Sequence, residues 1–438
     1  MNTRKIKVGV VGPGTIGHRV ITYVNRQPDM EIAAVSKAST HDYYETTKHV
    51  LALGIPIYPA PKKAGDEKAA VKEFRDYFTE LRNKQSLKNI EATPDDMVPG
   101  PIADMLDVCD VIVDCSGGRI GIKTIAEMNK ERYYVPYNTS NPPKKIKVIF
   151  QGGESKDMGK LSFNTSVNYH RAVDVGRSDE PYIRQVSCNT TALSRLLYLI
   201  RTNYIINRLY AVIVQRSSDP GQMTRFVLND VHMGDKMPSH HGPDVECVFD
   251  CVDDDFADSV NLLKSKITDD DIREKISTPT ILTGAIKVTT DQMHAQDLTL
   301  TFPVSLPFPK DNYPENEEEF HKILEASIIR NRFKFIDHPL DTSCEREAAR
   351  RVERMHGQQC NCGDIFEVVM GMYTFQPEKR ITPFGNEWVH LKMHIGVHQE
   401  AIVIPEIIDG IRALSYDVLK KSKEESIKTT DKSLGLRD

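Results

Sequence analysis

One cysteine of this sequence stands where a thiol can react. Cys188 lies in the run Val186 to Thr191, where a strand-like stretch gives way to the amphipathic pattern of residues 192–200. A thiol at the start of a helix is close to free backbone N–H groups and to the positive end of the helix dipole, and both lower its pKa. We therefore expect Cys188 to have a lowered pKa and to serve as a nucleophile. The alternative for a single cysteine is a small buried apolar side chain.

Basic side chains in three later clusters could work with this thiol. Arg216 ends a strand-like run that starts at Tyr210, and His240 and His241 are adjacent in a loop, so both clusters could receive a phosphate. His294 precedes an alternating strand, a boundary at which side chains are often exposed, and is a candidate general base. Spacing alone does not choose between His294 and His240 for that role.

The two adjacent histidines could instead bind a metal. No carboxylate or cysteine follows them at a convincing ligand spacing, and the trio His356, Cys360 and Cys362 has no clear fourth ligand. We therefore expect no metal site.

The N-terminal residues have the pattern of a dinucleotide-binding unit. A β-branched strand at 6–11 runs into a glycine motif at 12–17, then a helix-like stretch at 18–25 and a second strand at 31–36. A glycine motif between a strand and a helix, with a second strand at this distance, favours a Rossmann unit.

Each position of the glycine motif has an expected task. Gly12 makes the tight turn, Gly14 lets a pyrophosphate approach the backbone, and Gly17 lets helix and strand pack closely. The phosphates would lie at the helix N-terminus, beside Thr15 and Ile16.

The end of the second strand bears on which dinucleotide is bound. An Asp or Glu about 20 residues past the glycine motif would bond the ribose 2′-hydroxyl of NAD. Lys37 and Ser39 stand there instead and could hold a 2′-phosphate, so NADP is favoured or at least accepted beside NAD. Two further strands, at 110–115 and 147–150, run into glycines, and Gly153 is expected to line the cofactor crevice.

A reactive thiol and a dinucleotide in one chain indicate a class of reaction. A thiolate adds to an aldehyde, the adduct gives hydride to the nicotinamide, and a second nucleophile attacks the resulting thioester. A histidine is needed to take the proton.

The composition excludes several other functions. The chain has 438 residues, a formal net charge of -5 and a sequence pI of about 6.3, so no global charge favours nucleic acid or an anionic membrane. No apolar run reaches the roughly 18 residues of a membrane span, and no cleavable signal precedes the first strand. The eight cysteines do not resemble a disulfide framework. We expect a cytoplasmic protein with small-molecule ligands.

Several motifs together resemble one family, the archaeal-type (class II) phosphorylating glyceraldehyde-3-phosphate dehydrogenases. The resemblance extends from Ile6 to about Tyr416. The motifs that carry it are Gly-x-Gly-Thr-Ile-Gly at 12–17, Phe-Gln-Gly-Gly-Glu at 150–154, Leu-Ser-Phe-Asn at 161–164, the run at 186–191, the loop at 238–245 and Val-His-Gln-Glu at 397–400. It implies a homotetramer that converts glyceraldehyde 3-phosphate and inorganic phosphate reversibly into 1,3-bisphosphoglycerate, with NADP or NAD.

The resemblance also assigns roles to residues. It implies that Cys188 is the nucleophile and that His294 is the base. The expected contacts to substrate and phosphate are Asn189, Thr190, Arg216, His240, His241 and Gly242. The expected cofactor contacts include Ser217 and Gln399, the latter near the nicotinamide.

The sequence departs from the family at one point of the expected anion site. Gln215-Arg216-Ser217 stands where the family typically has two arginines followed by glycine. Glutamine has no charge to offer, so we expect a weaker phosphate site.

These observations predict an α/β protein, with a Rossmann doubly wound parallel sheet and an α+β catalytic domain whose sheet is mainly antiparallel. The expected domains are residues 1–187, completed by a C-terminal helix at 400–438, and residues 188–399. We interpret the charged run 62–89 as a solvated helix and the polar tail 421–438 as either a frayed helix or disordered.

Two alternatives stay open. A related aspartate-semialdehyde or N-acetylglutamyl-phosphate reductase would share the Rossmann unit, the cysteine and the histidine, but would bind a substrate carboxylate. A dinucleotide-binding protein with weakened catalysis is suggested by Gln215.

Overall fold

The chain divides into two compact units in a computed structural model. The model describes residues 4–61, 63, 65–84, 87, 90–140, 144–151, 154–216, 231–234, 236–267, 279–289, 293–303, 313–336, 364–371, 376–381 and 387–436. The first unit comprises Met1–Phe163, Ala172–Gln185 and Glu406–Leu434. The second comprises Asn164–Arg171, Val186–Pro405 and Gly435–Asp438.

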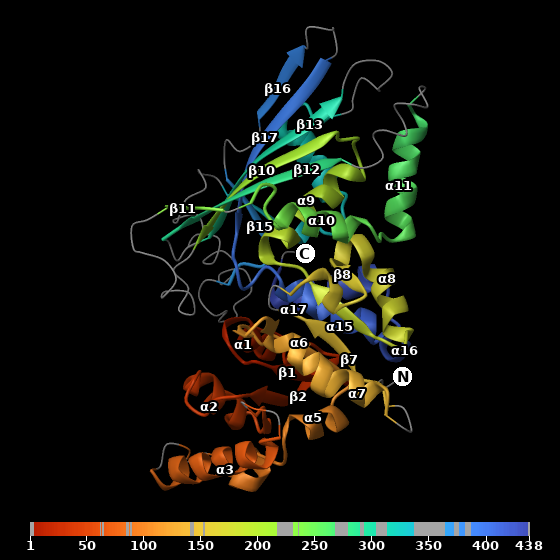
Figure 1. Cartoon of the computed structure of the whole chain (residues 1–438). Coiled ribbons are helices and arrows are strands. Elements are labelled where there is room, and N and C mark those ends of the chain that lie inside the picture. The colour runs from red at the N-terminus through yellow and green to blue at the C-terminus, as the bar shows by residue number, and fades with distance from the viewer. Residues whose placement is uncertain are drawn as a thin grey trace. The chain divides into compact units, whose positions relative to one another are not determined.

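A parallel sheet of seven strands lies at the centre of the first unit, in the order β3-β2-β1-β4-β7-β9-β8. Figure 1 labels β1, β2, β7 and β8 of this sheet. Its strands are β1 (Ile6–Val11), β2 (Met30–Lys37), β3 (Ile57–Pro59), β4 (Val111–Asp114), β7 (Lys147–Phe150), β8 (Leu161–Phe163) and β9 (Tyr182–Gln185). The central strands read as nearly continuous apolar runs because helices cover both faces of a parallel sheet. A small hairpin, β5 (Arg119–Ile120) and β6 (Lys123–Thr124), stands apart from this sheet.

Helices connect these strands and return from the end of the chain. They are α1 (Thr15–Val24), α2 (Tyr44–Ala52), α3 (Glu67–Asn83), α4 (Pro94–Met97), α5 (Ile102–Val108), α6 (Ile125–Asn129), the π-helix η1 (Lys130–Tyr134), α7 (Val135–Asn138), the 3-10 turn η2 (Lys156–Met158), α8 (Thr165–Arg177, with residues in both units), α15 (Ile404–Leu414), α16 (Tyr416–Leu419) and α17 (Lys423–Leu434). A Cβ on Gly410 of α15 would lie 3.2–3.3 Å from side chains of β7, β8 and β9. The C-terminal segment therefore packs closely on the parallel sheet.

The second unit is built on a mixed sheet, mainly antiparallel. Its main path runs β11-β12-β10-β13-β17-β15-β14, and β16 pairs with β17. The strands are β10 (Arg208–Arg216), β11 (Val231–Met233), β12 (Thr280–Val288), β13 (His294–Pro303), β14 (Phe333–Ile336), β15 (Val368–Gly371), β16 (Gln376–Ile381) and β17 (Glu387–Val397). The helices of this unit are α9 (Cys188–Arg201), α10 (His241–Phe249), α11 (Asp254–Ser265), α13 (Glu317–Glu325) and the 3-10 turn η3 (Arg330–Arg332).

This architecture confirms the predicted fold class and corrects one local prediction. The run 62–89 contains the predicted helix, α3, although Phe74 and Phe78 anchor it in the unit. The tail from 421 is not frayed: α17 is a helix with buried Ile427 and Leu434. Across the described part of the chain, none of the helices is long and apolar enough to cross a membrane.

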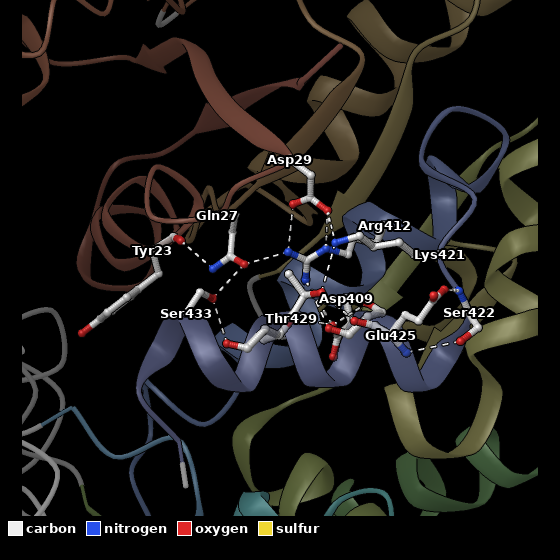
Figure 2. A network of polar contacts seen from close by, with 12 residues as sticks. Tyr23, Gln27, Asp29, Asp409, Arg412, Lys421, Ser422, Glu425, Thr429 and Ser433 are labelled. Carbon is white, nitrogen blue, oxygen red and sulfur yellow. Dashed lines mark hydrogen bonds and ion pairs between the residues drawn. The ribbon is translucent and has the colours of Figure 1, made fainter. Parts of the chain in front are cut away.

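A buried arginine ties the C-terminal helices to the parallel-sheet unit (Figure 2). The Arg412 guanidinium of α15 donates to both carboxylate oxygens of Asp29, at 2.9 Å each, and to Gln27 at 2.7 Å. It also donates to Thr430 of α17, and Lys421 Nζ lies 2.9 Å from Asp29. Burial alone would raise the pKa of Asp29, but the bonds and charges of Arg412 and Lys421 outweigh it and lower that pKa to about 2.

We expect Arg412→Met to destabilise the protein by about 3–5 kcal/mol, because Asp409 loses the Arg412 charge and Asp29 loses two hydrogen bonds and keeps Lys421 alone. Urea unfolding would measure the loss. The double variant Asp29→Asn/Arg412→Met should recover part of it, since the pair is then removed together. The exposed pair of Arg177 and Asp417 supplies the control, and Arg177→Met should cost far less. A similar loss in both arginine variants would contradict a special role for the buried network.

Candidate functional site

The glycine motif has the geometry of a phosphate cradle. Gly12 has a φ of +79°, and a Cβ there would lie 2.9 Å from the Ser116 backbone. A Cβ on Gly17 would lie 2.2 Å from the Gly12 carbonyl oxygen, so helix α1 can approach β1 only without that side chain. Gly14 is the N-cap of α1, no side chain caps it, and the first turn holds no acidic residue. The N–H groups beside Thr15 and Ile16 are therefore suited to the phosphates of a dinucleotide.

A buried carboxylate supports the loop next to this cradle. Asp114, the last residue of β4, accepts hydrogen bonds from the Ser116 backbone N–H at 3.0 Å, from Asn129 at 2.9 Å and from the Tyr134 hydroxyl at 2.7 Å. Because Gly12 packs against Ser116, this network fixes one wall of the glycine turn. Sequence reasoning gave Asp114 no role, since two of its partners, Asn129 and Tyr134, lie on helices later in the chain.

Lys37 and Ser39 form hydrogen bonds to other residues of the first unit. The Lys37 ammonium is buried and donates to the Asp42 carbonyl and to the Thr47 hydroxyl, at 2.6 Å each. Burial lowers the pKa of Lys37 to about 8. Ser39 Oγ accepts from the backbone N–H of His41 at 3.3 Å. Both side chains thus brace the connection between β2 and α2. Two other expected cofactor contacts, Gly153 and Ser217, lie outside the described residues.

Cys188 is the first residue of α9, as the sequence predicts. The N-cap is Ser187, whose hydroxyl accepts the Thr190 backbone N–H and lies 2.9 Å from the Thr190 hydroxyl. Asn189 is fully buried, and its Oδ1 accepts a 2.8 Å bond from Gln296 of β13. The cap and this bond hold the cysteine's end of α9 against the sheet.

The predicted lowering of the Cys188 pKa is wrong for this state of the protein. Burial raises the pKa of the thiol to about 12, and Glu400 adds to the rise. The Asn189 backbone N–H and the Arg216 charge lower it, but by less. The helix terminus therefore acts in the expected direction and is outweighed, because a thiolate is poorly solvated here.

His294, the first residue of β13, lies beside Arg216 at the end of β10. It is 2% exposed, and its Nδ1 accepts the Arg216 backbone N–H at 3.0 Å. Burial, reinforced by the Arg216 charge, lowers the pKa of His294 to about 3. The Arg216 charge also lowers the pKa of the Cys188 thiol. The same cation therefore acts on the cysteine and on the histidine, and the three residues share one electrostatic site. The expected exposure of His294 is not observed.

The Arg216 guanidinium is balanced by a carboxylate. It forms an ion pair with Glu400, and the two side chains are 7% and 5% exposed. Its Nε donates to Gln399 Oε1 at 3.2 Å. This pairing reduces the positive charge that Arg216 can offer to an anion.

Gln215 contacts the expected substrate loop directly. Its side-chain amide lies 2.9 Å from His241 Nε2, and Ser187 Oγ lies 3.4 Å from His241 Nδ1. Burial, with the charges of His240 and His294, lowers the pKa of His241 well below 6.5. Gly242 donates its backbone N–H to Thr283 at 2.9 Å, while His240 is exposed. A neutral amide thus faces a neutral imidazole at this point of the site.

Within the part of the chain that the structure describes, no three His, Cys, Asp or Glu side chains form a group suited to a metal ion. The trio at 356, 360 and 362 lies outside the described residues.

Comparison with known proteins decides the family. The chain is 32% identical over 434 residues to glyceraldehyde-3-phosphate dehydrogenase of Archaeoglobus fulgidus, covering 99% of this chain and 98% of the relative. It is 32% identical over 442 residues to the enzyme of that name from Pyrobaculum neutrophilum, covering 98% and 97%. The chain belongs to the glyceraldehyde-3-phosphate dehydrogenase family. This confirms the predicted archaeal-type resemblance, although no family model matches the chain.

A solved structure agrees on the fold of this glyceraldehyde-3-phosphate dehydrogenase. The crystal structure of aspartate semialdehyde dehydrogenase with NADP from Candida albicans has a TM-score of 0.50 and 15% identity, covering 95% of this chain and 98% of that one. At this identity the likeness concerns the fold alone.

The site of this dehydrogenase contains partners that sequence reasoning missed. Glu400, Gln296, Ser187 and Thr283 each bond to an expected site residue. Glu400 ends the Val-His-Gln-Glu motif at 397–400, and its place in that motif was the one signal that the sequence offered. The other three are ordinary strand or cap residues in the sequence.

Proposed function

We propose that this dehydrogenase oxidises glyceraldehyde 3-phosphate with inorganic phosphate to 1,3-bisphosphoglycerate, reversibly. The observation that carries the proposal is the position of Cys188 at the start of α9, in one electrostatic site with Arg216, Glu400 and His294. Full-length similarity to enzymes of this name supports the substrate.

Cys188 would bond to the aldehyde carbon. Cys188 is half-buried, and the proton of its thiol would pass to water as sulfur attacks C1. The adduct then loses hydride from C1 and becomes a thioester; a bound nicotinamide dinucleotide supplies the acceptor. A phosphate oxygen attacks the thioester carbon, the C–S bond breaks, and Cys188 recovers its sulfur as thiolate.

His294 would act mainly as a hydrogen-bond donor. Its Nδ1 is occupied by the Arg216 N–H, so the neutral ring carries its proton on Nε2. That N–H can stabilise negative charge on the C1 oxygen of the adduct. A group whose pKa is about 3 is a weak base, which argues against the base role implied by the resemblance.

The other expected site residues would contact substrate, phosphate or cofactor. Asn189, Thr190, His241 and Gly242 would contact substrate or phosphate, with His240 at the exposed edge. We assign Gln399 to the nicotinamide end of the cofactor. We also propose a cytoplasmic homotetramer, which light scattering of the purified protein would test.

A rate assay tests the proposed function. Glyceraldehyde 3-phosphate is supplied with NADP or NAD, with and without inorganic phosphate, and reduced cofactor is followed by absorbance. We expect turnover that depends on phosphate. Turnover without phosphate would indicate a non-phosphorylating enzyme, and no turnover would favour a dinucleotide-binding protein that has lost catalysis.

We further propose that both NADP and NAD are used, because no carboxylate ends β2 and Lys37 serves as a brace. Lys37→Met should then raise KM for the two cofactors by similar factors, within about threefold of each other. The reason is that a shifted β2–α2 connection affects the shared adenosine region. Steady-state kinetics with each cofactor would measure this. A rise of tenfold or more for NADP alone would show that Lys37 binds the 2′-phosphate.

A further inference from the structure

A pocket in the second unit holds two cations at the far end of the cysteine helix. It is a shallow pocket, and the roughly 270 Å³ of empty space in and above it includes open solvent. Arg201, the last residue of α9, and Lys264 of α11 line it together with Tyr204 and apolar side chains that include Ile205, Ile206 and Leu263. Since α9 has 14 residues, the pocket lies about 20 Å along the helix from Cys188.

Aromatic rings hold the Arg201 guanidinium in place. Its central carbon lies 4.9 Å from the Phe249 ring centre and 5.3 Å from that of Phe256. Tyr198, one turn earlier on α9, stacks on Phe256 with ring centres 5.7 Å apart. A guanidinium that contacts rings keeps its planar fork of N–H donors, and this fork suits two oxygens of one anion.

The charges in this pocket are not compensated by the described chain. Burial lowers the pKa of Arg201 to about 10, and no charge or hydrogen bond from a described carboxylate offsets that lowering. Burial also lowers the pKa of Lys264, and the Arg201 charge lowers it further. Two like charges that repel each other and have lost part of their water are stabilised by a bound anion.

We propose that this pocket binds a phosphate oxyanion, held by Arg201 and Lys264 and separate from the Cys188 site. The oxyanion can be inorganic phosphate or the phosphate group of a small organic phosphate. The apolar wall formed by Ile205, Ile206 and Leu263 gives an organic portion a surface to contact. The Arg201 site does not depend on the proposed reaction, whose own phosphate site would be the second one that a titration detects.

The test compares the full-length protein with Arg201→Met/Lys264→Met. Isothermal titration uses inorganic phosphate and, separately, glycerol 3-phosphate, at constant ionic strength. We expect two phosphate sites in the unsubstituted protein, one of them weakened at least tenfold in the variant. The variant Lys68→Met/Lys392→Met, which removes two exposed lysines, is matched in charge and should keep both sites. Tighter binding of glycerol 3-phosphate at the Arg201 site would identify an organic phosphate as its ligand, and equal binding would identify inorganic phosphate.

A second measurement guards against a folding defect. Lys264→Met removes one of the repelling cations and keeps the aromatic contacts of Arg201, so its Tm without added anion should be no lower than that of the unsubstituted protein. Phosphate should raise that Tm less than it raises the Tm of the unsubstituted protein. The proposal is overturned if phosphate binds with the same stoichiometry and affinity to all of these proteins. It is also overturned if Lys264→Met lowers the Tm in anion-free buffer, because Lys264 would then be paired within the protein.

Discussion

Replacing Cys188 with serine is expected to lower turnover of glyceraldehyde 3-phosphate by at least about 10³-fold. Serine keeps the size of the side chain and the hydrogen bonds of the α9 N-terminus, so the fold of the site should persist. A hydroxyl is a far weaker nucleophile and leaves the acyl carbon less readily than a thiolate. The measurement is kcat for the phosphate-dependent assay with purified protein.

Two controls separate a chemical loss from a structural one. Cys251 is an exposed cysteine of the same unit, and Cys251→Ser should leave kcat unchanged. The dissociation constant of NADPH, from fluorescence titration, should change by less than about twofold in Cys188→Ser. Retained turnover in that variant would exclude Cys188 as the nucleophile.

The raised pKa of Cys188 adds a pH dependence to this prediction. The thiolate fraction of a group whose pKa is about 12 grows tenfold for each pH unit below that value. Alkylation of Cys188 by iodoacetamide in the free enzyme should therefore accelerate steadily from pH 6 to pH 9. A plateau near pH 7 would mean that the thiol is already ionised, as the helix terminus alone would predict.

The elements that carry the site could be predicted from local pattern. The strand at 147–150 and the N-terminal strand at 6–11 match β7 and β1 residue for residue, because buried parallel strands are continuous apolar runs bounded by glycine or polar residues. The helix after Cys188 was visible for a similar reason, since its apolar residues recur with a helical period.

The partners within the site could not be predicted, because they depend on register between distant strands. Arg216 and Glu400 are 184 residues apart, and their pairing exists only once β10, β13 and β17 lie side by side. The same applies to Gln215, which meets His241 across 26 residues of chain. The sign of the Cys188 pKa shift also followed tertiary structure, because burial of the thiol in the folded unit outweighs the helix terminus.

The buried contacts of helix α17 could not be predicted from its polar sequence either. Its sequence is charged and carries no motif, which is typical of a solvated tail. Thr430 and Ser426 are nevertheless buried, because Asp409 and Arg412 of α15 supply their hydrogen-bond partners. Polar residues can thus form a buried interface when the matching groups come from another helix.

His294→Ala is expected to lower kcat by about 10²- to 10⁴-fold, because the oxygen at C1 loses the donor that stabilises its charge. The amide of glutamine can still donate a hydrogen bond, so kcat of His294→Gln should be at least tenfold higher than kcat of His294→Ala. A general base would not be replaced in this way, since an amide does not accept a proton at neutral pH. His394→Gln, at an exposed position on β17, is the matched control and should leave kcat unchanged.

The pH profile of the unsubstituted enzyme decides between the two roles of His294. A histidine whose pKa is lowered to about 3 stays neutral from pH 5 upward, so its own titration contributes no change in kcat/KM between pH 5 and 8. We expect kcat/KM to rise through this range with the thiolate fraction of Cys188, and to do so equally in His294→Gln. An inflection near pH 6.5 that vanishes in His294→Gln would instead identify His294 as the proton acceptor. In that case the bond from the Arg216 N–H to Nδ1 would have to break on substrate binding, because that bond is what places the ring proton on Nε2.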